Sequence, residues 1–140
     1  MTAEHKSDSP EYRLFSVEEA NALIPELERY FTITKKLIAK LDNVVQKKKK
    51  ESEGNGNIEW NPRSNLPVGM EFIPKTLKYT SKLSDKLRDK GVIIRGGNSW
   101  LADFPHLRDG KVVFLCWQLG EKKIGFWHEI DAGKAGRKPL

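Results

Sequence analysis

The feature that most restricts the fold is an apolar repeat near the start of the chain, whose steps alternate between three and four residues. Its positions are Ala20, Leu23, Leu27, Tyr30, Thr34, Leu37, Leu41 and Val44. A second line widens the stripe on one side, through Ile24, Phe31, Ile38 and Val45. A period of roughly 3.5 residues is typical of a long helix that packs lengthwise against another helix. We therefore predict a helix over residues 14–50, after a frayed terminus at residues 1–13.

The beginning of this helix and a break within it are both encoded locally. Ser16 and Glu19 have the spacing of a capping box, in which each side chain binds the backbone N–H of the other residue. Pro25 lies inside the apolar repeat, where a proline removes one helical hydrogen bond and collides with the preceding turn. We predict either a kink between Asn21 and Ile24 or a short helix followed by a second one, with the long straight part beginning at Pro25.

A second amphipathic pattern predicts another helix after a polar connection. Residues 51–66 are rich in Gly, Asn, Ser and Glu and have no periodicity, which indicates a flexible linker. Residues 67–90 follow a helical pattern that ends at Gly91, a residue suited to the left-handed position after a helix. The apolar face of this helix carries Ile73, Leu77, Thr80, Ser84 and Leu87. The opposite face carries Lys75, Lys78, Lys82 and Lys86.

These two helices predict an antiparallel helical hairpin with coiled-coil packing. Each seam leaves a second side uncovered, so we expect a homodimer that buries these sides in a four-helix arrangement. From residue 91 the pattern changes to short β-type runs, with a turn at Asp109-Gly110. Residues 91–140 therefore predict a small antiparallel β-sheet or hairpin and a C-terminal tail. The fold class is α+β, with residues 1–140 as a single domain.

The stretch FLCWQLGEKKIGFWHEID, residues 114–131, contains a cysteine, a histidine and acidic residues between aromatic ones. A two-residue turn that begins at Gly120 would pair Val113 with His128. This register places Cys116 and His128 on opposite faces of the hairpin, because side chains alternate along a strand. A Cys–His nucleophile pair is therefore disfavoured, and only a three-residue loop, whose usual glycine comes last and not first, would bring the two side chains together.

His128 has three interpretations. It is a core histidine bonded to a backbone carbonyl, or a pocket residue whose titration is tuned by Asp103 from a neighbouring loop. The third interpretation is a metal site formed by His128, His106 and Asp103, because two histidines and a carboxylate are a known ligand set. No ligand spacing in the sequence specifies such a site.

Several motifs of the second half resemble a known signature. They are Asp103-Phe104-Pro105, Leu115-Cys116-Trp117, Leu119-Gly120-Glu121, Trp127-His128-Glu129 and Ala135-Gly136-Arg137-Lys138-Pro139-Leu140. Together they resemble the C-terminal signature of the prokaryotic family catalogued as domain of unknown function 2203. Phe15-Ser16-Val17-Glu18-Glu19-Ala20-Asn21 is similar to its N-terminal motif. The family usually has Gly-Leu-Val before the Asp-Phe-Pro, where this chain has Trp100-Leu101-Ala102.

The resemblance supplies no reaction, but it has one structural implication. If Arg137 belongs to a shared motif, then the C-terminal tail is ordered and folds back near Asp103 and His128. We therefore expect the polar site to contain His128, Arg137, Asp103 and Glu129.

Composition and charge limit the function. The single cysteine, Cys116, cannot form an internal disulfide, and no apolar run approaches the roughly 20 residues that cross a bilayer. We expect a cytoplasmic protein without membrane contact. The net charge of the chain is +6, and its basic excess lies in residues 61–140, which hold 15 Lys and Arg against 8 Asp and Glu.

Three functions fit these features. The first is an interaction or small-anion-binding module, in which Asp103 orients His128 and Arg137 binds the anion. The second is a metal-binding protein or an enzyme that uses His128 as ligand or as acid and base. The third is a nucleic-acid binder that uses the Lys75–Lys90 face. The sequence specifies no cofactor and no reaction, so enzymatic activity stays open.

Overall fold

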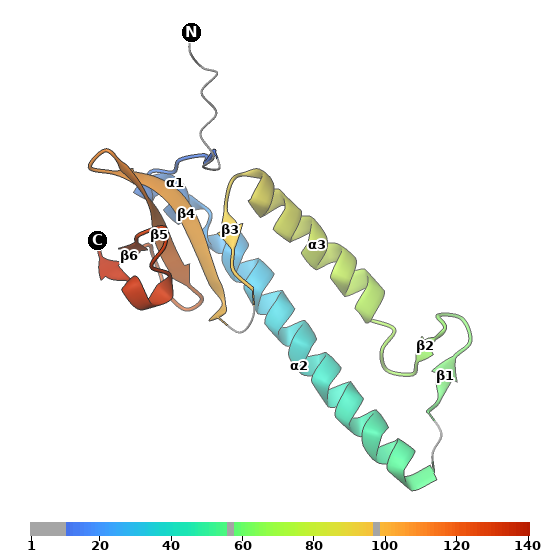
Figure 1. Cartoon of the computed structure of the whole chain (residues 1–140). Helices are drawn as coiled ribbons and strands as arrows, with labels where there is room; N and C mark the ends of the chain where they lie inside the picture. Colours follow the sequence, from blue (N-terminus) through green and yellow to red (C-terminus); the bar gives the residue numbers. More distant parts are fainter. Residues whose placement is uncertain (1–10, 56–57, 97–98) are drawn as a thin grey trace. The chain divides into compact units, whose positions relative to one another are not determined.

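The computed structural model describes residues 11–55, 58–96 and 99–140 (Figure 1). They form two compact units. The sheet unit contains the described residues up to Pro25 and those of Leu87–Leu140, and the helical unit contains the described residues of Glu26–Lys86. Most of the terminus that was predicted to fray, residues 1–10, lies outside the described residues.

Two helices replace the single helix predicted for residues 14–50. They are α1, Val17–Ala22, and α2, Ile24–Asn55. The break at Leu23 falls inside the predicted interval, because Pro25 has no N–H with which to continue the hydrogen bonds of α1. The prediction of a short helix followed by a long one is confirmed.

The capping box at the start of α1 is also confirmed. The backbone N–H of Glu19 donates to Ser16 Oγ at 3.0 Å, and the backbone N–H of Ser16 donates to Glu19 Oε1 at 2.7 Å. These hydrogen bonds hold the pKa of the Glu19 carboxyl below its usual value. The chain therefore enters α1 with two of its otherwise unpaired N–H groups satisfied.

The helical unit contains one long helix and one shorter helix, which run in opposite directions (Figure 1). After the 32-residue α2, a two-stranded ribbon pairs β1, Trp60–Asn61, with β2, Leu66–Pro67. The 17-residue α3, Ile73–Asp89, follows. The segment predicted as a flexible linker therefore holds the end of α2 and most of this ribbon.

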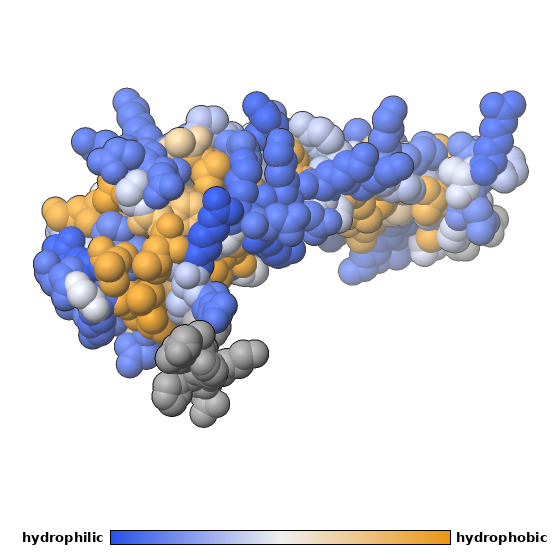
Figure 2. Space-filling model, turned by 90° about the horizontal axis from the view of Figure 1, so that it is seen from above, coloured by the Kyte–Doolittle hydropathy of each residue, from blue (hydrophilic) through white to orange (hydrophobic). Residues whose placement is uncertain are grey.

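The face pattern predicted for α3 is correct except at Leu77. Thr80, Ser84 and Leu87 are buried. All four lysines of the opposite face are exposed. Leu77, which was assigned to the apolar face, is 52% exposed. It is one of several large hydrophobic residues that reach the surface, and Figure 2 shows such residues among hydrophilic ones.

Gly91 ends α3 as predicted. Its backbone has φ of +101°, a left-handed conformation that side chains with a Cβ rarely adopt. A Cβ at this position would also lie 3.0 Å from Cβ of Arg13. Both the conformation and the close approach therefore require glycine.

The sheet unit contains a five-stranded antiparallel sheet in the order β3-β4-β5-β6-β7. The strands are β3, Ile93–Ile94; β4, Leu101–Arg108; β5, Lys111–Gln118; β6, Phe126–His128; and β7, Lys138–Pro139. The α+β class is confirmed, but the sheet is larger than the predicted hairpin. Asp103 and His106 lie within β4 and not on the loop that the sequence suggested.

Pro105 can sit inside β4 because its nitrogen faces away from β5. Its carbonyl accepts the backbone N–H of Phe15 at 2.7 Å. The nitrogen of a residue in an antiparallel strand points to the same side as its carbonyl, so the missing N–H does not interrupt the β4–β5 ladder. The same contact joins the segment before α1 to the edge of β4.

One face of the sheet forms the apolar core of this unit. Five side chains on it are completely or almost completely buried: Ala102, Phe104, Val113, Leu115 and Trp117. The ring of Phe15 packs edge-on against Phe104, with 5.3 Å between centroids. The opposite face carries the polar residues described below.

Among the described residues, no helix combines the length and the apolar character of a membrane span.

Candidate metal centre

The connection between β5 and β6 decides which side chains meet. The backbone N–H of Glu121 donates to the carbonyl of Gln118 at 3.0 Å, which closes a turn. Gly120 is the third residue of this turn, with φ of +105°, a position that favours glycine. The predicted turn, with Gly120 in the second place, is therefore wrong. Strand pairing with β5 resumes only in β6, which begins at Phe126.

This longer connection shifts the register by one residue. His128 pairs with Phe114 and not with Val113. A shift of one residue moves every side chain of a strand to the other face. The prediction that Cys116 and His128 lie on opposite faces is consequently wrong.

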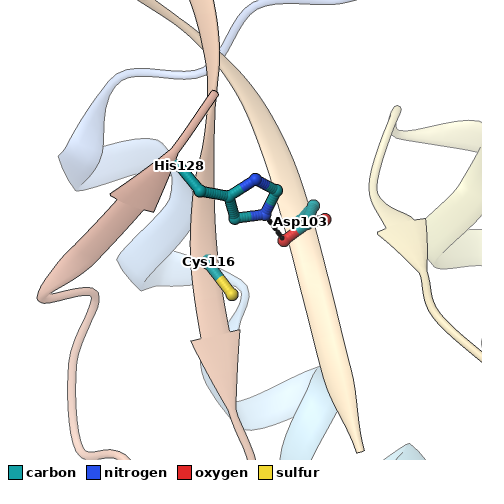
Figure 3. A group of neighbouring side chains, drawn as sticks. All are labelled: Asp103, Cys116 and His128. Atoms are coloured by element: carbon teal, nitrogen blue, oxygen red, sulfur yellow. Dashed lines mark hydrogen bonds and ion pairs between the residues drawn. The ribbon is translucent and has the colours of Figure 1, made fainter. Parts of the chain in front are cut away.

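Asp103, Cys116 and His128 form one buried cluster on three adjacent strands (Figure 3). His128 Nε2 lies 3.1 Å from Asp103 Oδ1. Each residue offers one potential ligand atom, and these three atoms all lie within 4.8 Å of one another. The three residues are only 1–2% exposed. Asp103 is paired directly with Cys116 in the sheet register, so β4 and β5 hold these two side chains next to each other.

Two of the three side chains are fixed by an outer partner. His128 Nδ1 lies 2.7 Å from the backbone carbonyl of Glu129. A carbonyl only accepts, so Nδ1 carries the hydrogen, and Nε2 is the nitrogen that faces Asp103. On the other side, Arg95 Nε donates to Asp103 Oδ2 at 2.8 Å. This leaves Oδ1 directed at the imidazole.

The ring of Phe114 lies against the imidazole. Phe114 lies edge-on to His128 with 5.6 Å between centroids, and Tyr12 lies edge-on to Phe114 at 5.5 Å. The guanidinium carbon of Arg95 is 5.4 Å from the centroid of the Phe114 ring. Because its three residues are almost fully buried, the cluster is shielded from water, and electrostatic interactions within it are stronger than in water.

The pKa of the Cys116 thiol is raised to about 12, mainly by burial and in addition by the nearby Asp103 carboxylate, while the Arg137 guanidinium acts in the opposite direction. The protonated thiol is a weak nucleophile, so the isolated side chain is unsuited to covalent catalysis near neutral pH. A metal ion at the same place would remove this proton.

Arg137 contacts both Glu121 and Cys116. Its Nη2 is 2.7 and 2.9 Å from the two carboxylate oxygens of Glu121, and it donates to the Cys116 carbonyl at 3.1 Å. Its guanidinium carbon also lies 4.1 Å from the centroid of the Phe126 ring. Burial lowers the pKa of Arg137, but the contact with Glu121 and the other interactions outweigh it and raise the pKa.

The contacts of Arg137 connect the C-terminal tail to the sheet. The 3₁₀ helix η2, Lys134–Gly136, leads into β7, which pairs with β6. Leu140 N–H donates to the carbonyl of Gly125 at 3.0 Å. The tail thus lies against the sheet near the cluster, and the hydrogen bonds of Arg137 go to Glu121 and to the Cys116 carbonyl and not to Asp103.

The two remaining predicted site residues lie apart from the cluster. Glu129 Oε2 is 2.7 Å from Lys111 Nζ, and this hydrogen bond lowers the pKa of Glu129. His106 Nδ1 is 2.7 Å from the carbonyl of Phe15. His106 is three residues from Asp103 on the same strand and so projects from the other face. The structure therefore does not bring His106 together with His128 and Asp103, and Cys116 lies beside these two residues instead.

Sequence reasoning missed Cys116 and Arg95. Cys116 was considered but was assigned to the wrong face, because the assignment depended on the turn. Arg95 carries no local signal: it lies just after β3, and only the pairing of β3 with β4 brings it to Asp103.

The protein is thus an α+β protein whose antiparallel sheet carries a buried Asp, Cys and His cluster. The chain belongs to the family of uncharacterized conserved proteins designated DUF2203, whose model matches residues 13–140. This confirms the resemblance seen in the motifs. Comparisons with curated proteins and with solved structures found no match. Five residues of the quoted motifs meet at the cluster or beside it: Asp103, Cys116, Glu121, His128 and Arg137.

Proposed function

We propose that this protein binds a divalent transition-metal ion, best matched by Zn²⁺, through Asp103 Oδ1, Cys116 Sγ and His128 Nε2. The observation that carries the proposal is the pairing of His128 Nδ1 with the Glu129 carbonyl. It leaves Nε2 facing a carboxylate oxygen at 3.1 Å. A lone pair on Nε2 would repel the carboxylate oxygen, so we expect a cation between these two atoms. That cation is either a proton or a metal ion.

The outer partners favour the metal ion. Histidines that bind metals usually donate their other N–H to a carbonyl or a carboxylate, as His128 does to Glu129. Carboxylate ligands are usually held by a further hydrogen bond, as Asp103 is by Arg95. The set of one nitrogen, one sulfur and one oxygen is among those that Zn²⁺ accepts.

The distances are compatible with a tetrahedral ion. Zinc lies about 2.0–2.2 Å from nitrogen and oxygen ligands, so two such ligands of a tetrahedron are roughly 3.4 Å apart. The distance of 3.1 Å between His128 Nε2 and Asp103 Oδ1 is close to this ligand-to-ligand separation. The Cys116 sulfur lies within 4.8 Å of a possible ligand atom of each of the other two residues, so a small movement of its side chain would bring it within reach of the same ion.

Three protein ligands would leave one coordination position for water or for an anion. This arrangement distinguishes catalytic zinc sites from structural ones, which have four protein ligands. The proposal thereby includes the small-anion site expected from the sequence, because the positively charged metal ion would bind the anion. A cytoplasmic location would suit it, because a reducing compartment keeps Cys116 as a free thiol.

Metal analysis of untagged protein tests the proposal. We expect about one equivalent of zinc per chain, and its loss in Cys116→Ser and in His128→Gln. His106→Gln is the matched control, because it removes an imidazole from the same sheet on the other face, and it should keep the metal. Replacement by Co²⁺ adds a second readout, since a cobalt–thiolate bond gives a charge-transfer absorption that Cys116→Ser would abolish.

The result that would overturn the proposal is equally specific. If the untagged protein binds neither Zn²⁺ nor Co²⁺, and nitrogen-15 NMR shows hydrogens on both ring nitrogens of His128, then the cation is a proton. The cluster would in that case be a buried ion pair with a structural role.

A further inference from the structure

A cavity lies between α2 and the beginning of α3, inside the helical unit. Its volume is about 200 Å³, and it is open to solvent. Three apolar side chains form its walls: Ile33 and Leu37 of α2, and Phe72, which directly precedes α3. All three are only half-buried. A ligand that covered them would remove apolar surface from water, which is favourable.

Two lysines of α2 line the same cavity. Lys36 and Lys40 are both exposed and lie about one helical turn apart. Like charges at this spacing repel each other. Lys40 Nζ lies 4.3 Å from the centroid of the Phe72 ring. This cation–π contact holds the ammonium group at the cavity, but it does not neutralise the positive charge.

Neither lysine forms an ion pair within the part of the chain that the structure describes. None of the residues three or four positions from them on α2 is acidic. Thr76, the remaining lining residue, is neutral. Glu71 stands next to Phe72 in the chain, but its Oε1 accepts the backbone N–H of Gly69 at 2.9 Å. The cavity therefore combines apolar walls with positive charge that no described carboxylate compensates.

We propose that this cavity binds a medium-chain carboxylate, with an alkyl chain of about six to eight carbons. The alkyl chain covers Ile33, Leu37 and Phe72, and the carboxylate has one oxygen for each of the two ammonium groups. The volume sets the length of the chain. One water molecule occupies about 30 Å³ in the liquid, so 200 Å³ correspond to about six waters, and a methylene group is of similar size.

Other classes of ligand match this cavity less well. An inorganic anion would leave the apolar walls exposed, and an uncharged hydrocarbon would leave both ammonium groups without a counter-charge. Drug-sized molecules usually occupy cavities of about 300–1,000 Å³, which is larger than this one. The inference concerns the helical unit alone and does not depend on the proposed metal site.

Isothermal titration calorimetry of the full chain tests the class of ligand. One equivalent of octanoate should bind at concentrations below those at which it forms micelles. The affinity should rise about fourfold for each methylene added from butanoate to octanoate. Octylammonium, which has the same chain with a positive head, should not bind. An affinity that is independent of chain length, equal binding of octylammonium, or no binding of octanoate at millimolar concentration would each overturn the proposal.

Charge variants test the two lysines. Lys36→Gln should weaken octanoate binding about fivefold, because one exposed charge pair is lost. Lys82→Gln is the matched control, since Lys82 is an exposed lysine of α3 outside the cavity lining, and it should keep the affinity. The double variant Lys36→Glu with Lys40→Glu should lose octanoate and bind octylammonium instead. This gain of binding cannot come from a folding defect, and its absence would contradict the assigned role of the lysines.

A filled cavity tests the location. Thr76→Phe adds a ring where the alkyl chain is expected, so octanoate binding should weaken about tenfold or more. Lys82→Phe places the same ring outside the lining and should bind normally. In the native chain, octanoate should shift the NMR signals of the Thr76 amide and of the Ile33 and Leu37 methyl groups. Undiminished binding by Thr76→Phe, or shifts confined to other residues, would overturn the proposal.

Discussion

His128 Nε2 and Asp103 Oδ1 lie 3.1 Å apart, although 25 residues separate them in the chain. Both side chains are almost fully removed from solvent. Arg95 holds the other oxygen of the same carboxylate. The carboxylate thus sits between a guanidinium and an imidazole in an apolar setting, where the loss of either interaction has a large cost.

Replacing Asp103 by asparagine should destabilise the metal-free protein. The amide keeps the shape but leaves Arg95 and His128 without their anion, so the free energy of unfolding should fall by about 3 kcal/mol. Urea denaturation after chelator treatment measures this. Glu129→Gln is the control, because its pair with Lys111 is exposed, and it should leave the denaturation midpoint unchanged. Equal effects of the two variants would show that the buried carboxylate has no special role.

The thiol of Cys116 should make the metal-free protein less stable at alkaline pH. Its pKa is about 12 in the folded state, against an ordinary value of 9.0. The contribution of the protonated thiol to the free energy of unfolding is therefore complete below about pH 9 and is lost as the pH rises toward 12. Between about pH 8 and about pH 10.5, the native chain should lose about 2 kcal/mol of unfolding free energy more than Cys116→Ser does. Parallel pH dependence in both proteins would contradict the raised pKa. Alkylation of the native thiol should be slow for the same reason.

Arg137→Lys should release the C-terminal tail. The lysine side chain is one atom shorter, so its ammonium does not reach the position from which Nη2 contacts both Glu121 oxygens and the Cys116 carbonyl, and charge-assisted bonds of this kind contribute about 1.5–3 kcal/mol. Hydrogen exchange should accelerate at the Leu140 amide, which bonds to Gly125, while the amides of the β4–β5 ladder keep their protection. Uniform acceleration throughout the sheet would instead indicate global destabilisation.

Ser16→Ala should weaken the start of α1. The substitution removes the acceptor for the Glu19 N–H, and loss of such a cap costs about 1 kcal/mol. Thermal unfolding followed by circular dichroism measures the effect. Ser16→Asp keeps an acceptor at the same place and should restore most of the stability. Failure of aspartate to restore it would mean that the hydroxyl acts through another contact.

Local features of the sequence determined the helices. The capping box at Ser16, the break before Pro25 and the end of α3 at Gly91 each depend on residues within one or two helical turns. Such interactions can be derived from spacing alone, because neighbouring residues are forced together by the helix itself. The α+β class and the family followed from the same kind of pattern.

Only the tertiary structure decided the site. Whether Cys116 lies beside His128 depends on a one-residue difference in register. The seven residues between β5 and β6 determine this register, and the alternation of apolar and polar side chains does not reveal it. Arg95 reaches Asp103 through the pairing of β3 with β4. The sequence contained the chemical groups of the cluster, but their meeting depends on hydrogen bonds between strands that are distant in the chain.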